Sequence, residues 1–152
     1  MKWTHRFRVD APVEAIYEIG LAPDNWFTFF RAYRGLESVD SNWPEEGSTI
    51  VLRFAVLGPW TVRLKQTIVE HERGRRLLIY EEALSGLWID HPQLEFEQEN
   101  GATTVTLTVD PTSKVFLARL LFPLIFWPFA WLTPLAMKRF KVLIESSQPS
   151  VD

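Results

Sequence analysis

The sequence has no cysteine among its 152 residues. Disulfide bonds, zinc ribbons, thiolate nucleophiles and iron–sulfur clusters are therefore excluded. Its 3 histidines are His5, His71 and His91. They lack the i,i+4 spacing of helical metal ligands, and none has a second histidine nearby. We therefore expect no metal site.

The sequence also has few glycines and no net positive charge. The chain has 7 glycines and no G-x-G-x-x-G or P-loop pattern, so nothing points to a nucleotide cofactor and we expect no cofactor at all. The formal net charge of −3 gives no overall attraction for nucleic acid. Residues 1–10 are polar and charged, so we expect no secretory signal peptide and take the cytoplasm as the default location.

Aromatic residues are abundant instead, at 14% of the chain, with 7 Trp and 11 Phe. The length suits one domain with a single core. We expect that domain over residues 1–147, followed by a short disordered tail at 148–152. Rings in this number either fill a core or line a pocket.

Hydrophobic periodicity predicts an α+β fold. A half-buried strand opens the chain, and two short helices follow it, the first starting near Pro12 and the second carrying Trp26. A series of alternating segments separated by turn signals then predicts sequential antiparallel strands. These segments are 33–40, 49–57, 60–68, 76–84, 87–98 and 103–110. Asn100-Gly101 is the strongest hairpin signal in the sequence.

One face of such a sheet needs a cover, and the segment 113–147 is the only one left that is long enough to provide it. The expected architecture is a curved antiparallel sheet of about six to seven strands wrapped around a long C-terminal helix. Pro123, Pro128 and Pro134 fall inside that helix. We therefore expect it to be kinked, or irregular in its first part.

The order of these pieces resembles the START-like helix-grip superfamily (SRPBCC), which includes polyketide cyclase/dehydrase-type proteins, lipid-transfer domains and plant pathogenesis-related allergens. The likeness covers nearly the whole chain, although each piece is weak alone. The matching pieces are residues 7–17, the Trp26 helix, 47–49, 74–80 and the hairpin 96–106. The resemblance implies an internal apolar cavity for a hydrophobic small molecule or lipid. It implies no catalytic residue, because the superfamily has no universal catalytic motif.

Two kinds of side chain are candidates for lining such a cavity. Polar residues in otherwise apolar rows would anchor a ligand, or would simply be paired within the protein; these are His5, Gln66 and Asp90, with Tyr80 as a further orienting group. Apolar residues would supply the walls, or would simply fill the core; these are Trp26, Phe30, Phe54, Trp60, Leu64, Trp88, Phe96, Phe122 and Phe126.

An enzyme of the cyclase/dehydratase type in the same cavity is the alternative function. Its acid–base groups would come from His5, Tyr80 and Asp90. Asp90-His91 is discounted as a catalytic pair, because neighbouring residues of a strand point to opposite faces. Glu81-Glu82 and Glu95/Glu97/Glu99 are paired carboxylates. The Glu95 series lies on one strand face and is expected to be solvated, and we do not expect a hydrolase site built on either group.

The segment 115–137 has Arg119 as its sole charged residue. Three interpretations stay open. In the first, the segment spans a membrane. In the second, one face packs on the sheet while residues 117–137 contact a membrane surface, with Lys138, Arg139 and Lys141 at the headgroups, or contact a second subunit. In the third, the protein's own loops cover the segment. A homodimer through this helix would make the chain an interaction module, which is a further function class.

Overall fold

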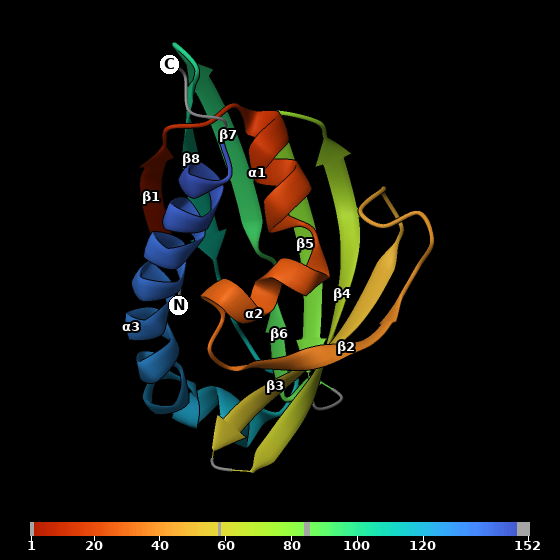
Figure 1. Cartoon of the computed structure of the whole chain (residues 1–152). Helices are drawn as coiled ribbons and strands as arrows, with labels where there is room; N and C mark the ends of the chain where they lie inside the picture. The colour runs from red at the N-terminus through yellow and green to blue at the C-terminus, as the bar shows by residue number, and fades with distance from the viewer. Residues whose placement is uncertain (1, 58, 84–85, 149–152) are drawn as a thin grey trace.

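The computed structural model describes residues 2–57, 59–83 and 86–148, and the side chains of 56, 57 and 122–130 lie outside that description. Figure 1 shows one curved sheet with the helices gathered on its concave side. The elements are β1 (Trp3–Val9), α1 (Val13–Gly20), a 3-10 turn (Pro23–Asn25), α2 (Trp26–Phe29), β2 (Tyr33–Val39), β3 (Thr49–Leu57), β4 (Trp60–Glu72), β5 (Arg76–Ala83), β6 (Trp88–Asp90), β7 (Gln93–Glu99), β8 (Ala102–Val109) and α3 (Phe116–Ser146). Of the expected tail 148–152, residues 149–152 lie outside the described residues.

The sheet follows the order β1-β8-β7-β5-β4-β3-β2, and β6 pairs with β5 beside this path. Every described pair of strands is antiparallel. The predicted fold is therefore confirmed: an antiparallel sheet curved around a long C-terminal helix, with short helices after the first strand.

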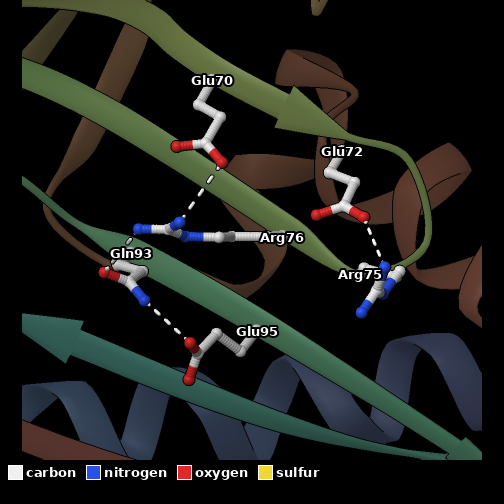
Figure 2. A network of polar contacts seen from close by, with 6 residues as sticks. All are labelled: Glu70, Glu72, Arg75, Arg76, Gln93 and Glu95. Atoms are coloured by element: carbon white, nitrogen blue, oxygen red, sulfur yellow. Dashed lines mark hydrogen bonds and ion pairs between the residues drawn. The ribbon is translucent and has the colours of Figure 1, made fainter.

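The alternation of side chains along each strand gives the sheet an apolar concave face and a polar convex face. On the convex face, a network of polar side chains crosses β4, β5 and β7 (Figure 2). Arg76 there donates from Nη1 to Glu70 Oε1 at 3.2 Å and from Nη2 to Gln93 Oε1 at 3.4 Å, and Gln93 Nε2 donates to Glu95 at 2.8 Å. Glu97 pairs with Arg6 at 2.7 Å. These pairs lie on a solvent-exposed face, and each contributes little to the stability of the fold.

The β7–β8 turn is as the sequence predicts, whereas the predicted strand 87–98 differs from the structure. Asn100 and Gly101 both have positive φ, 52° and 78°, as the tight turn between β7 and β8 requires. The predicted strand 87–98, in contrast, is wrong as one continuous element. It breaks at His91-Pro92 into β6 and β7, because proline has no N–H to continue the ladder. The backbone stays linked to β5 there, since Ile79 N donates to Pro92 O at 2.9 Å.

The core lies between the concave face and the C-terminal half of α3. Phe140 contacts Phe7 edge to face at 6.3 Å between ring centroids and Phe29 at 5.1 Å. Ile144, two residues before the end of α3, is fully buried in the same cluster. Van der Waals packing and apolar burial at these positions hold the helix on the sheet.

The first half of α3 behaves differently. It is helical through all three prolines. In Figure 1 its first turns lie across the lower end of the sheet, and the rest runs up beside β1. Of the two expectations, a kinked helix or an irregular first part, the kinked helix is therefore the one observed. Several of its apolar side chains are exposed, among them Phe116 at 77% and Leu120 at 69%. Only one half of α3 therefore contributes fully to the core.

A pair of substitutions on α3 tests this division. We expect Ile144→Ala to lower the free energy of unfolding by about 2–5 kcal/mol, because it leaves a cavity at a fully buried site. Val142→Ala is the control, since Val142 is 59% exposed on the same turn of helix, and we expect a change within about 0.5 kcal/mol. Urea unfolding followed by circular dichroism measures both. Equal effects of the two substitutions would contradict the packing described above.

Candidate functional site

The two ends of the concave face differ in burial. At the end covered by α1, α2 and the last turns of α3, here called the closed end, inward side chains such as Ile68 and Leu77 are 0–1% exposed. At the opposite end, here called the open end, several inward side chains remain partly exposed although they point to the same face as buried neighbours such as Leu52, Ala83 and Asp90. The partly exposed ones are Phe54, Leu64, Gln66, Glu81 and Trp88. Partial exposure of inward apolar groups is a property of concave binding surfaces.

A row of three polar side chains crosses the open end. Gln66 on β4 is opposite Glu81 on β5, and Glu81 is opposite Asp90 on β6. Directly opposed residues of neighbouring strands point to the same face with Cβ atoms about 5 Å apart. Gln66 Nε2 donates a hydrogen bond to Glu81 Oε2 at 2.7 Å. Two carboxyl groups and one amide therefore meet inside an otherwise apolar surface.

The carboxyl groups of this row are hard to ionise. Burial is the main cause that raises the pKa of Glu81 from 4.5 to about 7. Hydrogen bonds from Gln66 and with Trp88 lower this pKa in part, whereas the negative charge of Asp90 raises it further. Burial also raises the pKa of Asp90, while backbone N–H groups of Asp110 and His91, each 2.8 Å from Oδ1, lower it in part. No ion pair joins either carboxylate to a Lys or Arg in the part of the chain that the structure describes.

Gln66 carries a second signal. Its Oε1 atom is buried, and no described group donates a hydrogen bond to it. A buried acceptor without a partner costs free energy, and a hydroxyl or amine entering the open end would remove that cost. The row can therefore accept hydrogen bonds from a ligand through Gln66, and it can donate or accept a proton through Glu81.

The structure brings several of the sequence-predicted residues together at the open end, namely Phe54, Leu64, Gln66, Trp88 and Asp90. Asp90 is 3% exposed. Its neighbour His91 turns to the other face, where its ring contacts Tyr80 at 5.3 Å, as the alternation of the strand predicts. The pairing of Asp90 with backbone N–H groups shows that this residue is satisfied within the protein as well as facing the row.

Other predicted residues lie elsewhere on the concave side. His5 is stacked between Trp3 and Phe7 on β1, at 5.9 and 5.8 Å. The register places His5 level with Leu77, three strand spacings away (about 14 Å), and Glu81 lies a further four residues (about 13 Å) along β5. Phe30 packs between the open and closed ends and contacts Phe54 at 6.1 Å.

Trp26 and Phe96 belong to the closed core, at 5% and 8% exposure. The indole N–H of Trp26 donates to Gly20 O at 2.8 Å, so its polar atom is satisfied within the fold. Phe96 packs against Tyr17 at 5.1 Å. Both rings therefore fill the core, which is the alternative that the sequence left open for the aromatic set.

Two predicted residues are not on this surface. Tyr80 lies on the convex face of β5, where its hydroxyl donates to Glu82 Oε2 at 2.9 Å. Because neither Tyr80 nor His5 lies beside Asp90, the three acid–base groups expected from the sequence do not come together. Trp60 is 75% exposed at the β3–β4 hairpin rather than inside. Trp60 is the first residue of β4, at the tip of the hairpin, so its place in the alternation does not bury it. The side chains of Phe122 and Phe126 lie outside the described ones.

Glu81 is the residue that the sequence analysis missed. It was noted only as one of a pair of carboxylates with Glu82 and was not included among the candidate site residues. The signal was present, because Leu77, Ile79, Glu81 and Ala83 alternate on one face of β5. A carboxylate in that row had to point inward.

A depression of about 280 Å³ lies beside the β4–β5 turn, at the closed end, lined by Val13, Glu14, Tyr17, Arg73 and Gly74. Within the described residues, no cluster of His, Asp and Glu is placed to hold a metal ion. Among the same residues, none of the helices combines the length and the apolar character needed to cross a membrane.

Solved structures match the fold over nearly the whole chain. Ara h 8.0201, a Bet v 1-like protein with a helix-grip fold, aligns with a TM-score of 0.74 at 12% identity, covering 97% of this chain and 99% of that one. A Rhodobacter sphaeroides protein aligns at 0.73 and 15% identity, covering 97% and 93%. A Thermus thermophilus protein aligns at 0.71 and 16% identity, covering 98% and 100%. At such identities the likeness shows the fold alone.

The sequence itself gives no further assignment, because no protein-family model matches it and no curated protein matches it. The chain therefore has a helix-grip fold with a polar row inside its concave face, and its function has to be argued from that surface.

The pKa of Glu81 generates a test of the row. A carboxyl whose pKa is higher in the folded than in the unfolded state binds its proton more tightly when folded, so stability falls as pH rises from about 4.5 to about 7. Glu81→Gln removes this loss. We expect the variant to gain stability relative to the wild type over that window, by at most about 3 kcal/mol, in urea unfolding at several pH values.

Glu82→Gln is the matched control on the opposite face. The hydroxyl of Tyr80, first, and then Lys114 lower the pKa of Glu82. Its stabilising contribution is present above the unfolded-state pKa and is lost as pH falls through the lower folded-state pKa, so the difference between Glu82→Gln and the wild type has the opposite sign. A Glu81→Gln difference that does not vary with pH would contradict the buried placement of Glu81.

Proposed function

We propose that this protein binds a hydrophobic small molecule or lipid between the open end of the sheet and α3. The observation that carries the proposal is the difference between the two ends of the concave face. Side chains of the same inward rows are sealed at the closed end and partly exposed at the open end, as Ile68 and Leu64 on β4 illustrate. Apolar side chains left accessible inside a concave surface gain free energy when an apolar ligand covers them.

The polar row specifies the kind of ligand. Phe54, Leu64 and Trp88 offer apolar contact, while Gln66 and Glu81 offer hydrogen bonds at one place within it. An amphiphile with one hydroxyl, carbonyl or amine group and an apolar body fits this distribution. Apolar burial supplies most of the affinity, at roughly 25 cal/mol per Å² before the costs of binding are subtracted, and the row orients the polar group.

The order of motifs supports a closer classification within this fold. The opening strand and helix, the Gly47 turn, the β5 strand and the Asn100-Gly101 hairpin occur in the order of START-like proteins. We therefore place the chain in the START-like superfamily as part of the proposal. Binding of a hydrophobic ligand in the concave face is what that classification implies.

A filling substitution tests the proposed site. Leu64→Trp enlarges a partly exposed inward side chain at the open end, so it should occupy ligand space at little cost in packing. We expect at least a tenfold weaker affinity, about 1.4 kcal/mol, for a fluorescent fatty-acid probe titrated into the purified protein. Thr61→Trp on the exposed face of the same strand is the control and should bind as the wild type does.

Native mass spectrometry of the purified protein, with extraction of any bound lipid, identifies the natural ligand. The proposal fails if the wild type binds no apolar probe, or if Leu64→Trp and Thr61→Trp bind it equally well while both remain folded by circular dichroism.

Acid–base catalysis on a ligand in the same place is a second candidate, and one observation favours it. The pKa of Glu81 is raised to about 7, which suits proton transfer near neutral pH, and Asp90 lies opposite. A catalyst and a binder differ in what they hold after incubation with a lipid extract. With a catalyst, wild type and Glu81→Gln retain different compounds, product and substrate; with a binder they retain the same compound.

A further inference from the structure

The first half of α3 exposes an unusual amount of apolar surface. Phe116, Leu117, Leu120 and Trp131 are 77%, 68%, 69% and 71% exposed. We define the α3 apolar surface by six exposed residues among those whose side chains the structure describes: Phe116, Leu117, Leu120, Leu121, Trp131 and Leu132. Large apolar side chains exposed on two stretches of one helix, 116–121 and 131–132, indicate contact with another apolar body.

Positive charge accompanies this surface. Arg119 lies between Phe116 and Leu120 on the helix, and Lys138 and Arg139 follow Leu135 by three and four residues, on the same side of α3. No acidic residue occurs from 111 to 144. Among the described residues, none of these three cations has an ion-pair partner, whereas Lys114 is paired with Glu82 and Lys141 with Glu145.

We propose that the α3 apolar surface docks onto an anionic lipid bilayer, with Arg119, Lys138 and Arg139 at the level of the phosphate groups. Apolar side chains would enter the boundary between headgroups and acyl chains, and the cations would be attracted by the negative surface potential. This charge complementarity selects the occupant. In a symmetric pair of chains each surface would bring the same three cations against the other, and no acidic side chain of α3 before Glu145 is there to neutralise them.

The position of this surface adds a functional consequence. In Figure 1 the first turns of α3 and the β3–β4 hairpin, which carries the exposed Trp60, lie at the same end of the molecule. That is the open end of the concave face. Docking there would bring the proposed ligand site next to the bilayer, so that an apolar ligand could exchange without crossing water. This consequence depends on the proposed ligand binding, but the docking itself does not.

The experiment is co-sedimentation with lipid vesicles, without any added ligand. We expect the wild type to sediment with vesicles of phosphatidylcholine containing about 30% phosphatidylserine, at least about tenfold more strongly than with phosphatidylcholine alone. Raising the salt concentration should weaken the binding, because exposed charges are screened.

Two variants test the two components of the surface. Leu120→Glu places a negative charge in the apolar part, and Lys138→Glu with Arg139→Glu reverses the basic part; each should reduce binding to anionic vesicles by at least about tenfold. Val69→Glu is the matched control, since Val69 is also an exposed apolar residue, at 45%, but lies on β4. It should bind as the wild type does, and circular dichroism should show that all variants are folded.

The docking proposal is overturned if the wild type stays in the supernatant, if it binds both vesicle types equally, or if Leu120→Glu binds as the wild type does. A dimer in sedimentation velocity that Leu120→Glu dissociates would also overturn it in favour of a second copy. Leu64→Trp separates the two proposals, because it should lose the fatty-acid probe and keep the vesicles, whereas Leu120→Glu should keep the probe and lose the vesicles.

Discussion

The structure depends on the contact between the last turns of α3 and the concave face of the sheet. Phe140 and Ile144 bury their side chains among Phe7, Phe29 and the inward rows of the strands. A curved antiparallel sheet has one apolar face that must be kept from water, and this helix is the long element that covers it. Because the contact is concentrated near the C-terminal end of α3, the two ends of the sheet are left in different states. The closed end is packed like a protein interior, and the open end retains accessible apolar surface.

The polar row is tolerable only at the open end. Two carboxyl groups on neighbouring strands repel each other when ionised, and burial adds a desolvation cost to each. Gln66 and two backbone N–H groups offset part of that cost. In the closed end the same groups would have to be neutral or fully paired. A surface that reduces stability in the free protein while offering hydrogen bonds to a ligand is typical of binding sites, where the polar group of the ligand completes the pairing.

The first half of α3 also carries accessible apolar side chains, but on the outside of the molecule. Several of its described apolar side chains, Phe116 and Leu117 among them, lie outside the core. Three prolines within the helix redirect its first turns across the lower end of the sheet. The helix therefore has a core-forming half and a half that is available for an external contact. The open end of the sheet and this external surface lie together, which connects the proposed binding of a ligand with the proposed docking on lipid.

The sequence by itself determined the order of elements and most of the strand faces. Alternation of apolar and polar residues is a local property, so it placed Gln66 and Asp90 inward and His91 outward, and Asn100-Gly101 located the β7–β8 turn because only a few residues adopt positive φ. The tertiary structure decided what no local pattern contains. The separation of His5 from the row and the pairing of Glu81 with Gln66 and Asp90 depend on which strands become neighbours. Likewise, composition showed that 115–137 is too apolar for one buried face, but only the packing of Phe140 and Ile144 decided which part of the helix is covered and which part faces outward.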